Sequence, residues 1–267
     1  MHKENKVSLV FLIIAGIVML FPIYILFMTS FKSESEIFVV SLWPKLFTLE
    51  SIKGALSVKF LRSIFNSLLV ASTVTVVAMI LHAMCGYALA RLRFPFQKTI
   101  FMIIVSTLMI PMTTILVPLF MICKLLGITN SYSGLIIPAL FNAYGIFLFR
   151  QFYMGFPKEL EEAAEVEGCS KARTFFTIAL PLSKPMIVPL VIAFFLGNWN
   201  NYLWPLIINK KEILYTVQVY LANMVSGYAI PWNILIASTA LAAVPVFILF
   251  LLMQRQLVEG IKITGLK

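Results

Sequence analysis

The sequence predicts an all-α polytopic membrane protein with six transmembrane helices. Hydrophobic residues make up 61% of the 267 residues, and charged residues only 12%, about half of their usual share in soluble domains. The mean hydropathy is +0.96. Six apolar runs are each long enough to cross about 30 Å of hydrocarbon at about 1.5 Å per residue. A core that faces lipid and other helices follows from this composition.

The first apolar run is too long for the core of a signal peptide and has no small-residue cleavage site. Each of the later runs is separated from its neighbours by a polar segment. Prolines lie inside five of the six runs, at Pro22, Pro111, Pro118, Pro138, Pro189, Pro205 and Pro245. The expected spans are residues 7–29, 66–89, 99–123, 134–152, 185–208 and 233–253.

Three regions are expected along the chain. Residues 1–60 hold the N-terminal tail, the first span and a polar segment, and residues 61–254 hold the transmembrane core. Residues 255–267 form a basic-ended tail. No internal repeat of 20 to 50 residues is visible.

The basic residues indicate how the chain is oriented. The net charge of +10 is spread over the ends of the apolar runs rather than along one stripe, so we expect no nucleic-acid partner. Six spans place both termini on one side, which carries thirteen Lys and Arg residues against eight on the other. The positive-inside rule then places both termini on the cytoplasmic side of a bacterial-type inner membrane.

Several chemistries are not expected. We find no Asp, Glu, Lys or Arg deep within a span, although proton- and ion-coupled carriers commonly hold such residues. His82 is the one titratable residue in mid-span, and we interpret it as packed between helices. The three cysteines have no paired spacing, and no phosphate-binding GxxxxGK[ST] loop is present. We therefore expect no enzyme and no cofactor or metal in this chain, so that any ATP and Mg²⁺ belong to a partner.

A polar, helix-prone segment at residues 156–185 interrupts the apolar runs. Pro157 suits the first position of a helix, where its missing N–H costs little, and Gly168 suits a left-handed helix end. Five of the eleven acidic residues lie in this segment, and those in the first helical turn are favoured by the helix dipole. The five acidic residues of the segment are Glu159, Glu161, Glu162, Glu165 and Glu167.

A second short helix is expected after Gly168. Ser170 can cap its N-terminus, and Pro181 and Pro185 are expected to end it. Small residues beside the first helix allow another chain to approach closely. We interpret residues 156–185 as a surface that another protein grips from the aqueous side.

The spacing within this segment is specific. Three residues separate the alanine pair from the glycine, and nine separate the glycine from the isoleucine. This pattern resembles the EAA signature of ABC-importer permease subunits, whose EAA loop is the coupling helix held by an ATPase. Glu167 stands where the family often has Asp. The resemblance assigns ATPase coupling to Glu162, Ala163, Ala164, Gly168, Ile178, Leu180 and Pro181.

Further motifs are similar to those of the carbohydrate branch of this family. They are Asn66-Ser67, residues 86–91 (GYALAR), Phe94-Pro95 and residues 199–206 (WNNYLWPL). The chain looks like the MalG-like half of a maltose-type permease heterodimer. The resemblance covers roughly residues 60–267 and implies a type I ABC importer fold. It also implies a second homologous permease, two ATPase subunits and an extracytoplasmic solute-binding protein as partners.

The expected function is a permease subunit that imports a sugar or oligosaccharide by alternating between inward- and outward-open states. Amides that bond hydroxyls and aromatic rings that cover sugar C–H surfaces are the groups expected along a solute pathway. The candidates are Asn198, Trp199, Asn200, Asn201, Tyr202 and Asn142. Interfacial aromatic anchoring and helix–helix hydrogen bonding are the alternative roles for these residues. Residues 209–232 are the expected dock for the binding protein.

Two other functions remain open from the sequence. An importer of another solute, such as glycerol phosphate, fits the same branch. A self-contained secondary carrier is the alternative from a different class, and transport by the purified chain without an ATPase distinguishes it.

Overall fold

The computed structural model describes residues 6–227 and 229–264, and every regular element in these ranges is a helix. The Lys and Arg count above includes Lys3 and Lys267, which lie outside the described residues, as does the end of the expected tail. The α-helices are α1 (Lys6–Ser30), α2 (Glu50–Ala55), α3 (Val58–Arg91), α4 (Gln97–Ser106), α5 (Met112–Leu125), α6 (Tyr132–Ile136), α7 (Ala143–Met154), α8 (Lys158–Val166), α9 (Lys171–Thr174), α10 (Leu180–Leu182), α11 (Lys184–Trp199), α12 (Leu203–Ile208), α13 (Val217–Val225) and α14 (Trp232–Thr264). Shorter helical turns are η1 (Glu34–Glu36), η2 (Thr107–Met109), η3 (Ile137–Leu140), η4 (Phe175–Ala179) and η5 (Glu212–Leu214).

The fold class predicted from the sequence is confirmed. Among the described residues, four helical stretches are long and apolar enough to cross a membrane: Ser8–Ser30, Val58–Arg91, Tyr132–Met154 and Trp232–Gln256. Two further pairs of helices pass the same test but are bent, by 108° between Met109 and Met112 and by 76° between Leu182 and Lys184. Six spans result if each bent pair counts as one.

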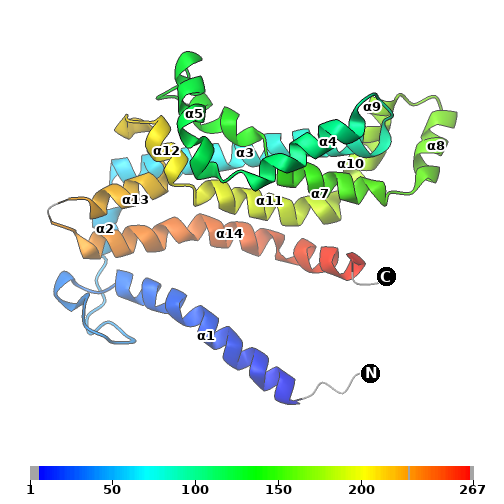
Figure 1. Cartoon of the computed structure of the whole chain (residues 1–267). Coiled ribbons are helices and arrows are strands. Elements are labelled where there is room, and N and C mark those ends of the chain that lie inside the picture. Colours follow the sequence, from blue (N-terminus) through cyan, green and yellow to red (C-terminus); the bar gives the residue numbers. More distant parts are fainter. Residues whose placement is uncertain (1–5, 228, 265–267) are drawn as a thin grey trace.

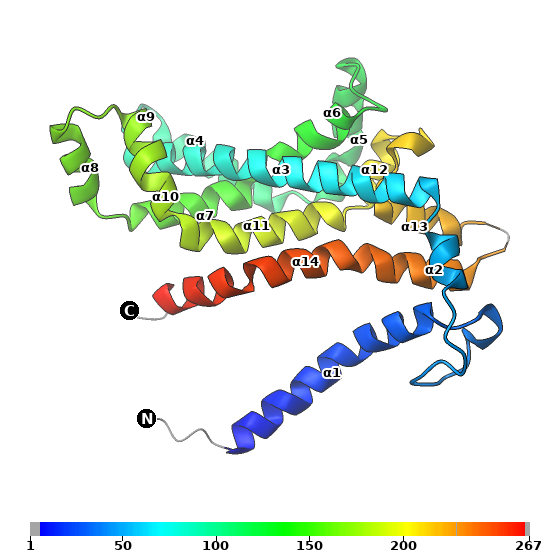
Figure 2. The same cartoon turned by 180° about the vertical axis from the view of Figure 1, so that it is seen from behind.

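The spans form a bundle with α3 at its centre. Helix α3 packs against α7 and α11, and α14 covers α11. Figures 1 and 2 show α1 on the far side of α14, splayed away from the rest of the bundle. Helix α8 stands across one end of the bundle, and α2, α12 and α13 lie at the opposite end.

The closest helix contact in the bundle is between α3 and α7. A Cβ on Gly86 would lie 2.6 Å from Phe149 Cβ and 2.8 Å from the backbone nitrogen of Arg150. Only a residue without a side chain fits there. Next to this contact, Tyr87, Tyr153 and Phe175 pack edge-on or tilted in the buried core that ends beside α8.

Two helix boundaries differ from the sequence prediction. Helix α3 begins at Val58 rather than residue 66, because Ser57 caps it by accepting a hydrogen bond from the Phe60 N–H. Helix α14 continues to Thr264, through most of the segment expected to be a separate tail. Both helices therefore extend past the apolar run that predicted them.

The third predicted span is not a single helix. Ile110 adopts an extended backbone (φ −94°, ψ 114°) and Pro111 follows it. The residue before proline is disfavoured in the helical region, and proline cannot donate the backbone hydrogen bond that would continue the helix. The chain therefore turns by 108° into α5, which rises away from the bundle in Figure 1.

The fourth and fifth predicted spans are also interrupted. The fourth consists of α6, η3 and α7, with an extended residue, Phe141, before α7. The fifth ends as α11 at Trp199, and α12 begins at Leu203. The two breaks lie on either side of one cavity, which is described below.

Candidate functional site

Local side-chain chemistry shapes the EAA loop (residues 156–185). Pro157 is the N-cap of α8, one residue before its predicted place. Gly168 has φ +76°, as predicted, and the helix closes with hydrogen bonds from Gly168 N to Glu165 O (3.0 Å) and from Cys169 N to Ala164 O (2.9 Å). These two bonds make a Schellman motif, which requires the left-handed residue that glycine supplies. Ser170 then caps α9, as predicted, by accepting from the Arg173 N–H.

Pro181 does not end the second helix, contrary to the prediction. The chain passes from α9 through a π-helical turn, η4, into α10, which includes Pro181 near its start. A wider π turn suits the loss of one backbone donor. The break comes at Ser183, which is fully buried, with its Oγ 2.6 Å from Ala179 O and 2.8 Å from Tyr153 Oη.

The seven residues of the EAA signature divide into two groups. Glu162, Ala163, Gly168 and Pro181 are exposed. Ala164 is buried, and Ile178 and Leu180 are half-buried, both of them against the aromatic core next to α3. The first group is available to a partner, and the second holds the loop on the bundle.

An ion pair that the sequence reasoning missed joins α8 to α3. The Nε of Arg91 lies 2.9 and 3.0 Å from the two carboxylate oxygens of Glu161, and a terminal guanidinium nitrogen donates to Phe156 O at 3.2 Å. Both side chains are largely buried, with exposed fractions of 7% and 14%. Arg91 is the last residue of the GYALAR motif, and Glu161 directly precedes the EAA triplet. The motifs therefore drew attention to both residues, but they did not predict that the two side chains are in contact.

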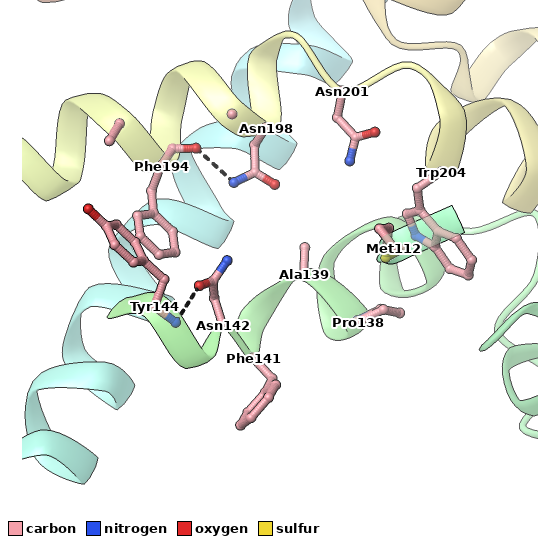
Figure 3. A pocket seen from close by; sticks show the side chains of 12 residues that line it. Met112, Pro138, Ala139, Phe141, Asn142, Tyr144, Phe194, Asn198, Asn201 and Trp204 are labelled. Atoms are coloured by element: carbon pink, nitrogen blue, oxygen red, sulfur yellow. Dashed lines mark hydrogen bonds between the residues drawn. The ribbon is translucent and has the colours of Figure 1, made fainter. Parts of the chain in front are cut away.

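A cavity of about 470 Å³ opens in the middle of the bundle, where the fourth and fifth spans are interrupted. Asn142, Asn198 and Asn201 turn their amides toward the same space in Figure 3. The wall is otherwise apolar or aromatic. Among the described residues, the cavity is lined by Met112, Pro138, Ala139, Phe141, Asn142, Tyr144, Ala193, Phe194, Gly197, Asn198, Asn201 and Trp204, of which none is charged.

Two of the three amides are held by backbone groups of their own helices. Asn142 caps α7 by accepting from the Tyr144 N–H at 3.0 Å, and Asn198 donates to Phe194 O at 2.8 Å. Both bonds use only part of the amide, so each side chain keeps donor or acceptor capacity for another group. A neutral, hydroxyl-bearing molecule would find hydrogen-bond partners and apolar wall in the same cavity.

His82 packs against the interruption between η3 and α7, next to Asn142. Its Nε2 lies 3.0 Å from Leu140 O and 3.1 Å from the backbone nitrogen of Asn142. The ring tautomer decides which bond forms: a protonated Nε2 donates to Leu140 O, and an unprotonated Nε2 accepts from the Asn142 N–H. The ring is buried against Phe194, and a Cβ on Gly145 would overlap it. The prediction that His82 packs between helices is confirmed, and the residue also fixes the start of α7.

The six candidate pathway residues do not share one surface. Asn142, Asn198 and Asn201 line the main cavity. Trp199 is buried and stacked on Phe195, and it borders a smaller cavity of about 250 Å³ together with Asn200. Tyr202 lines neither of them. A helix turns by about 100° per residue, so neighbouring positions on α11 face different spaces.

Three comparisons with known proteins agree with this architecture. Residues 82–263 match the family described as "Binding-protein-dependent transport system inner membrane component". The chain is 32% identical over 266 residues to the arabinooligosaccharides transport system permease protein AraQ of Bacillus subtilis, covering 96% of this chain and 94% of the relative. It is 34% identical over 263 residues to the sn-glycerol-3-phosphate transport system permease protein UgpE of Yersinia enterocolitica, covering 94% of each chain.

A solved structure shares the fold. A chain in the crystal structure of a bacterial ABC transporter involved in the import of the acidic polysaccharide alginate superposes with a TM-score of 0.83. The match covers 94% of this chain and 95% of that one, at 22% sequence identity.

Proposed function

The chain belongs to the family of binding-protein-dependent transport system inner membrane components, and we propose that it is one of two permease subunits of an ATP-driven sugar or oligosaccharide importer. In this proposal the second subunit is a homologous, non-identical permease. Two ATPase subunits bind and hydrolyse ATP with Mg²⁺, and an extracytoplasmic protein delivers the solute. The chain itself carries out no chemical step.

The exposed face of α8 is the observation that carries the proposal. A Cβ on Gly168 would meet no atom within 4 Å, so the chain leaves open space at a residue whose left-handed backbone favours glycine. Beside it, Glu162 and Ala163 are also exposed. A short acidic helix with small residues, joined to α3 by the Arg91–Glu161 pair and with Glu162 and Ala163 exposed, suits a groove on an ATPase subunit.

The orientation of the chain supports this assignment. Helix α1 begins and α14 ends at the same end of the bundle as α8 (Figure 1). This is also the end with more Lys and Arg residues, which favours the cytoplasmic side. We therefore place both termini and the EAA loop in the cytoplasm, and η5 and α13, within the expected dock at residues 209–232, on the opposite face.

The test is a Gly168→Leu variant in the complete transporter reconstituted in vesicles. We expect the complex to assemble and hydrolyse ATP, but with solute uptake reduced at least tenfold, because the side chain occupies the docking face. Gly127→Leu is the matched control. Gly127 also has a left-handed backbone (φ +69°) and open space around its Cβ, but it lies in the α5–α6 loop, far from α8. Normal coupled uptake by Gly168→Leu would contradict the proposal.

The cavity supports a neutral solute. A phosphate or carboxylate group loses strong hydration on entering such a site and needs charge-assisted donors in return. The amides of Asn142, Asn198 and Asn201 can bond hydroxyl groups, but no described Lys or Arg reaches the cavity wall. We therefore favour a sugar or oligosaccharide as the solute. Glycerol phosphate is the second candidate, because the relative UgpE is a glycerol-3-phosphate permease protein.

Competition distinguishes the two solute classes. Reconstituted transporter, supplied with its binding protein, should take up neutral pentose or hexose oligosaccharides in an ATP-dependent manner. Glycerol 3-phosphate in tenfold excess should leave that uptake unchanged. Uptake of glycerol 3-phosphate at a comparable rate would exclude the neutral-solute assignment, and ATP-independent uptake by the chain alone would exclude the ABC mechanism.

A further inference from the structure

The loop between α1 and α2 buries two of its four charged residues and exposes most of its apolar side chains. Lys32 and Glu36 are buried, with exposed fractions of 2% and 7%. Most of the apolar residues that follow are exposed, with fractions of 74% for Phe38, 60% for Trp43 and 71% for Leu46. A loop surrounded by water normally shows the opposite arrangement.

The two buried charges satisfy the backbone of the loop. The Lys32 ammonium donates to Val39 O at 2.9 Å and to Ser41 O at 3.1 Å. The Glu36 carboxylate accepts from the Lys45 N–H at 2.8 Å. Water would satisfy these backbone groups at no structural cost. Their pairing with buried charges is useful where water is scarce, because unpaired backbone groups cost several kcal/mol each in a low-dielectric layer (about 2–7).

The loop also folds back along a membrane span. The Tyr24 hydroxyl donates to Leu42 O at 3.0 Å. Tyr24 precedes the end of α1 at Ser30 by six residues, or about 9 Å along the helix axis. Figure 1 shows the loop at the end of α1 away from α8, turned back beside the helix. Its apolar surface thus continues the exposed apolar surface of α1.

We propose that residues 38–47 lie in the interfacial layer of the bilayer, at the membrane face opposite α8. Val40, Trp43 and Leu46 then contact lipid chains, and the exposed Lys45 reaches the headgroup phosphates. Trp favours this layer because it joins a large apolar ring to one polar N–H. Lys can keep its stem apolar while its charge stays in the polar zone. The loop anchors the outer end of α1, the helix whose N-terminal end splays away from the bundle.

Site-directed spin labelling tests the environment directly. A nitroxide is attached at Val40→Cys in the assembled transporter, in lipid nanodiscs, after the native cysteines have been replaced. Ser35→Cys is the matched control, because Ser35 is exposed in the polar Glu34–Glu36 turn at the start of the same loop. We expect the label at residue 40 to be relaxed strongly by oxygen, which concentrates in lipid, and at least fivefold less by a water-soluble nickel chelate than the label at residue 35.

The other outcomes overturn the proposal in different ways. Strong relaxation by the nickel chelate at residue 40 would place the loop in water. Weak relaxation by both reagents would place it against protein, either the second permease or the binding protein. If the cysteine-free complex does not assemble, quenching of native fluorescence by brominated lipids replaces the label. Trp43→Phe should then reduce the lipid-quenched signal, whereas Trp199→Phe, at a buried position, should not.

Discussion

The side chain of Arg91, the last residue of α3, holds both carboxylate oxygens of Glu161 in α8, at 2.9 and 3.0 Å. The chain connects α8 directly only to α7 and α9. The ion pair adds a lateral link to the central helix of the bundle, so that a displacement of α8 reaches α3 without passing through the loop backbone.

Removing one partner of this pair should uncouple the transporter. Arg91→Ala leaves the Glu161 carboxylate largely buried without a cation, which costs about 3–5 kcal/mol in comparable buried pairs. We expect a lower thermal midpoint and a fall of at least tenfold in solute transported per ATP hydrolysed. The matched control is Lys171→Ala, which breaks the exposed pair between Lys171 and Glu165 in the same loop.

That control should change neither quantity measurably, because exposed pairs contribute about 0–1 kcal/mol. Arg91→Lys keeps the charge but not the contact with both oxygens, and should fall between wild type and Arg91→Ala. If Arg91→Ala transports with a normal ratio of solute to ATP, α8 acts on the spans through the loop backbone alone.

The contact of α3 with α7 predicts a second, purely structural effect. Gly86→Ala would place a methyl group 2.6 Å from Phe149 Cβ and 2.8 Å from a backbone nitrogen, so the two helices must separate. Overpacking of this kind typically costs about 1–3 kcal/mol. We expect a thermal midpoint lowered by several degrees in detergent, and reduced yield of the assembled complex.

Gly16→Ala is the control for this substitution. Gly16 also lies inside a helix, but its Cβ would meet no atom within 4 Å. Alanine should be neutral or slightly stabilising there, because it favours helix by up to about 1 kcal/mol relative to glycine. Equal destabilisation by both substitutions would show that the α3–α7 contact is looser than the structure has it.

The features that the sequence predicted correctly are those encoded by a few neighbouring residues. The left-handed end at Gly168 and the cap at Ser170 depend on local backbone and side-chain chemistry. The six apolar runs follow from composition. Pro111 and Pro181 could not be told apart in this way. A proline can break a membrane helix, bend it or leave it continuous, and the outcome depends on whether neighbouring groups satisfy the freed carbonyls.

The site residues divide in the same way. The sequence placed amides on the fifth span, but which of them face the cavity depends on where α5 and η3 lie against α11. The choice of Glu161 over Glu162 as the partner of Arg91 likewise depends on how α8 is rotated. Adjacent residues of one type are equivalent in sequence and become distinct only through tertiary contacts.

His82 should influence solute affinity without touching the solute. His82→Phe keeps an aromatic ring against Phe194 but removes the nitrogen that lies 3.1 Å from the backbone of Asn142 and 3.0 Å from Leu140 O. The start of α7 should then shift, and the Asn142 amide with it. We expect the half-saturating solute concentration for uptake to rise about tenfold, equivalent to about 1.4 kcal/mol, with a smaller change in the maximal rate.

His82→Gln provides the rescue for this prediction, because its amide restores a polar group that can donate to Leu140 O or accept from the Asn142 N–H. Recovery of affinity in His82→Gln and not in His82→Phe would identify His82 as a positioning residue. Unchanged affinity in both variants would contradict that role and leave His82 as a space-filling core residue.

Two amides near the C-terminal end of α11 provide the sharpest test of the cavity. Asn198 lines it, whereas Asn200, two positions along the chain, borders the smaller cavity and accepts a hydrogen bond from Gln218 at 3.3 Å. Asn198→Ala removes a hydrogen-bonding group that a sugar hydroxyl would use, which is worth about 0.5–1.5 kcal/mol. The half-saturating concentration for uptake should therefore rise by roughly two- to twelvefold, while Asn200→Ala should leave it unchanged. The measurement is ATP-dependent uptake of labelled oligosaccharide over a range of solute concentrations, with assembly of each variant checked by size-exclusion chromatography.

If Asn200→Ala weakens uptake and Asn198→Ala does not, the solute passes along the other face of α11.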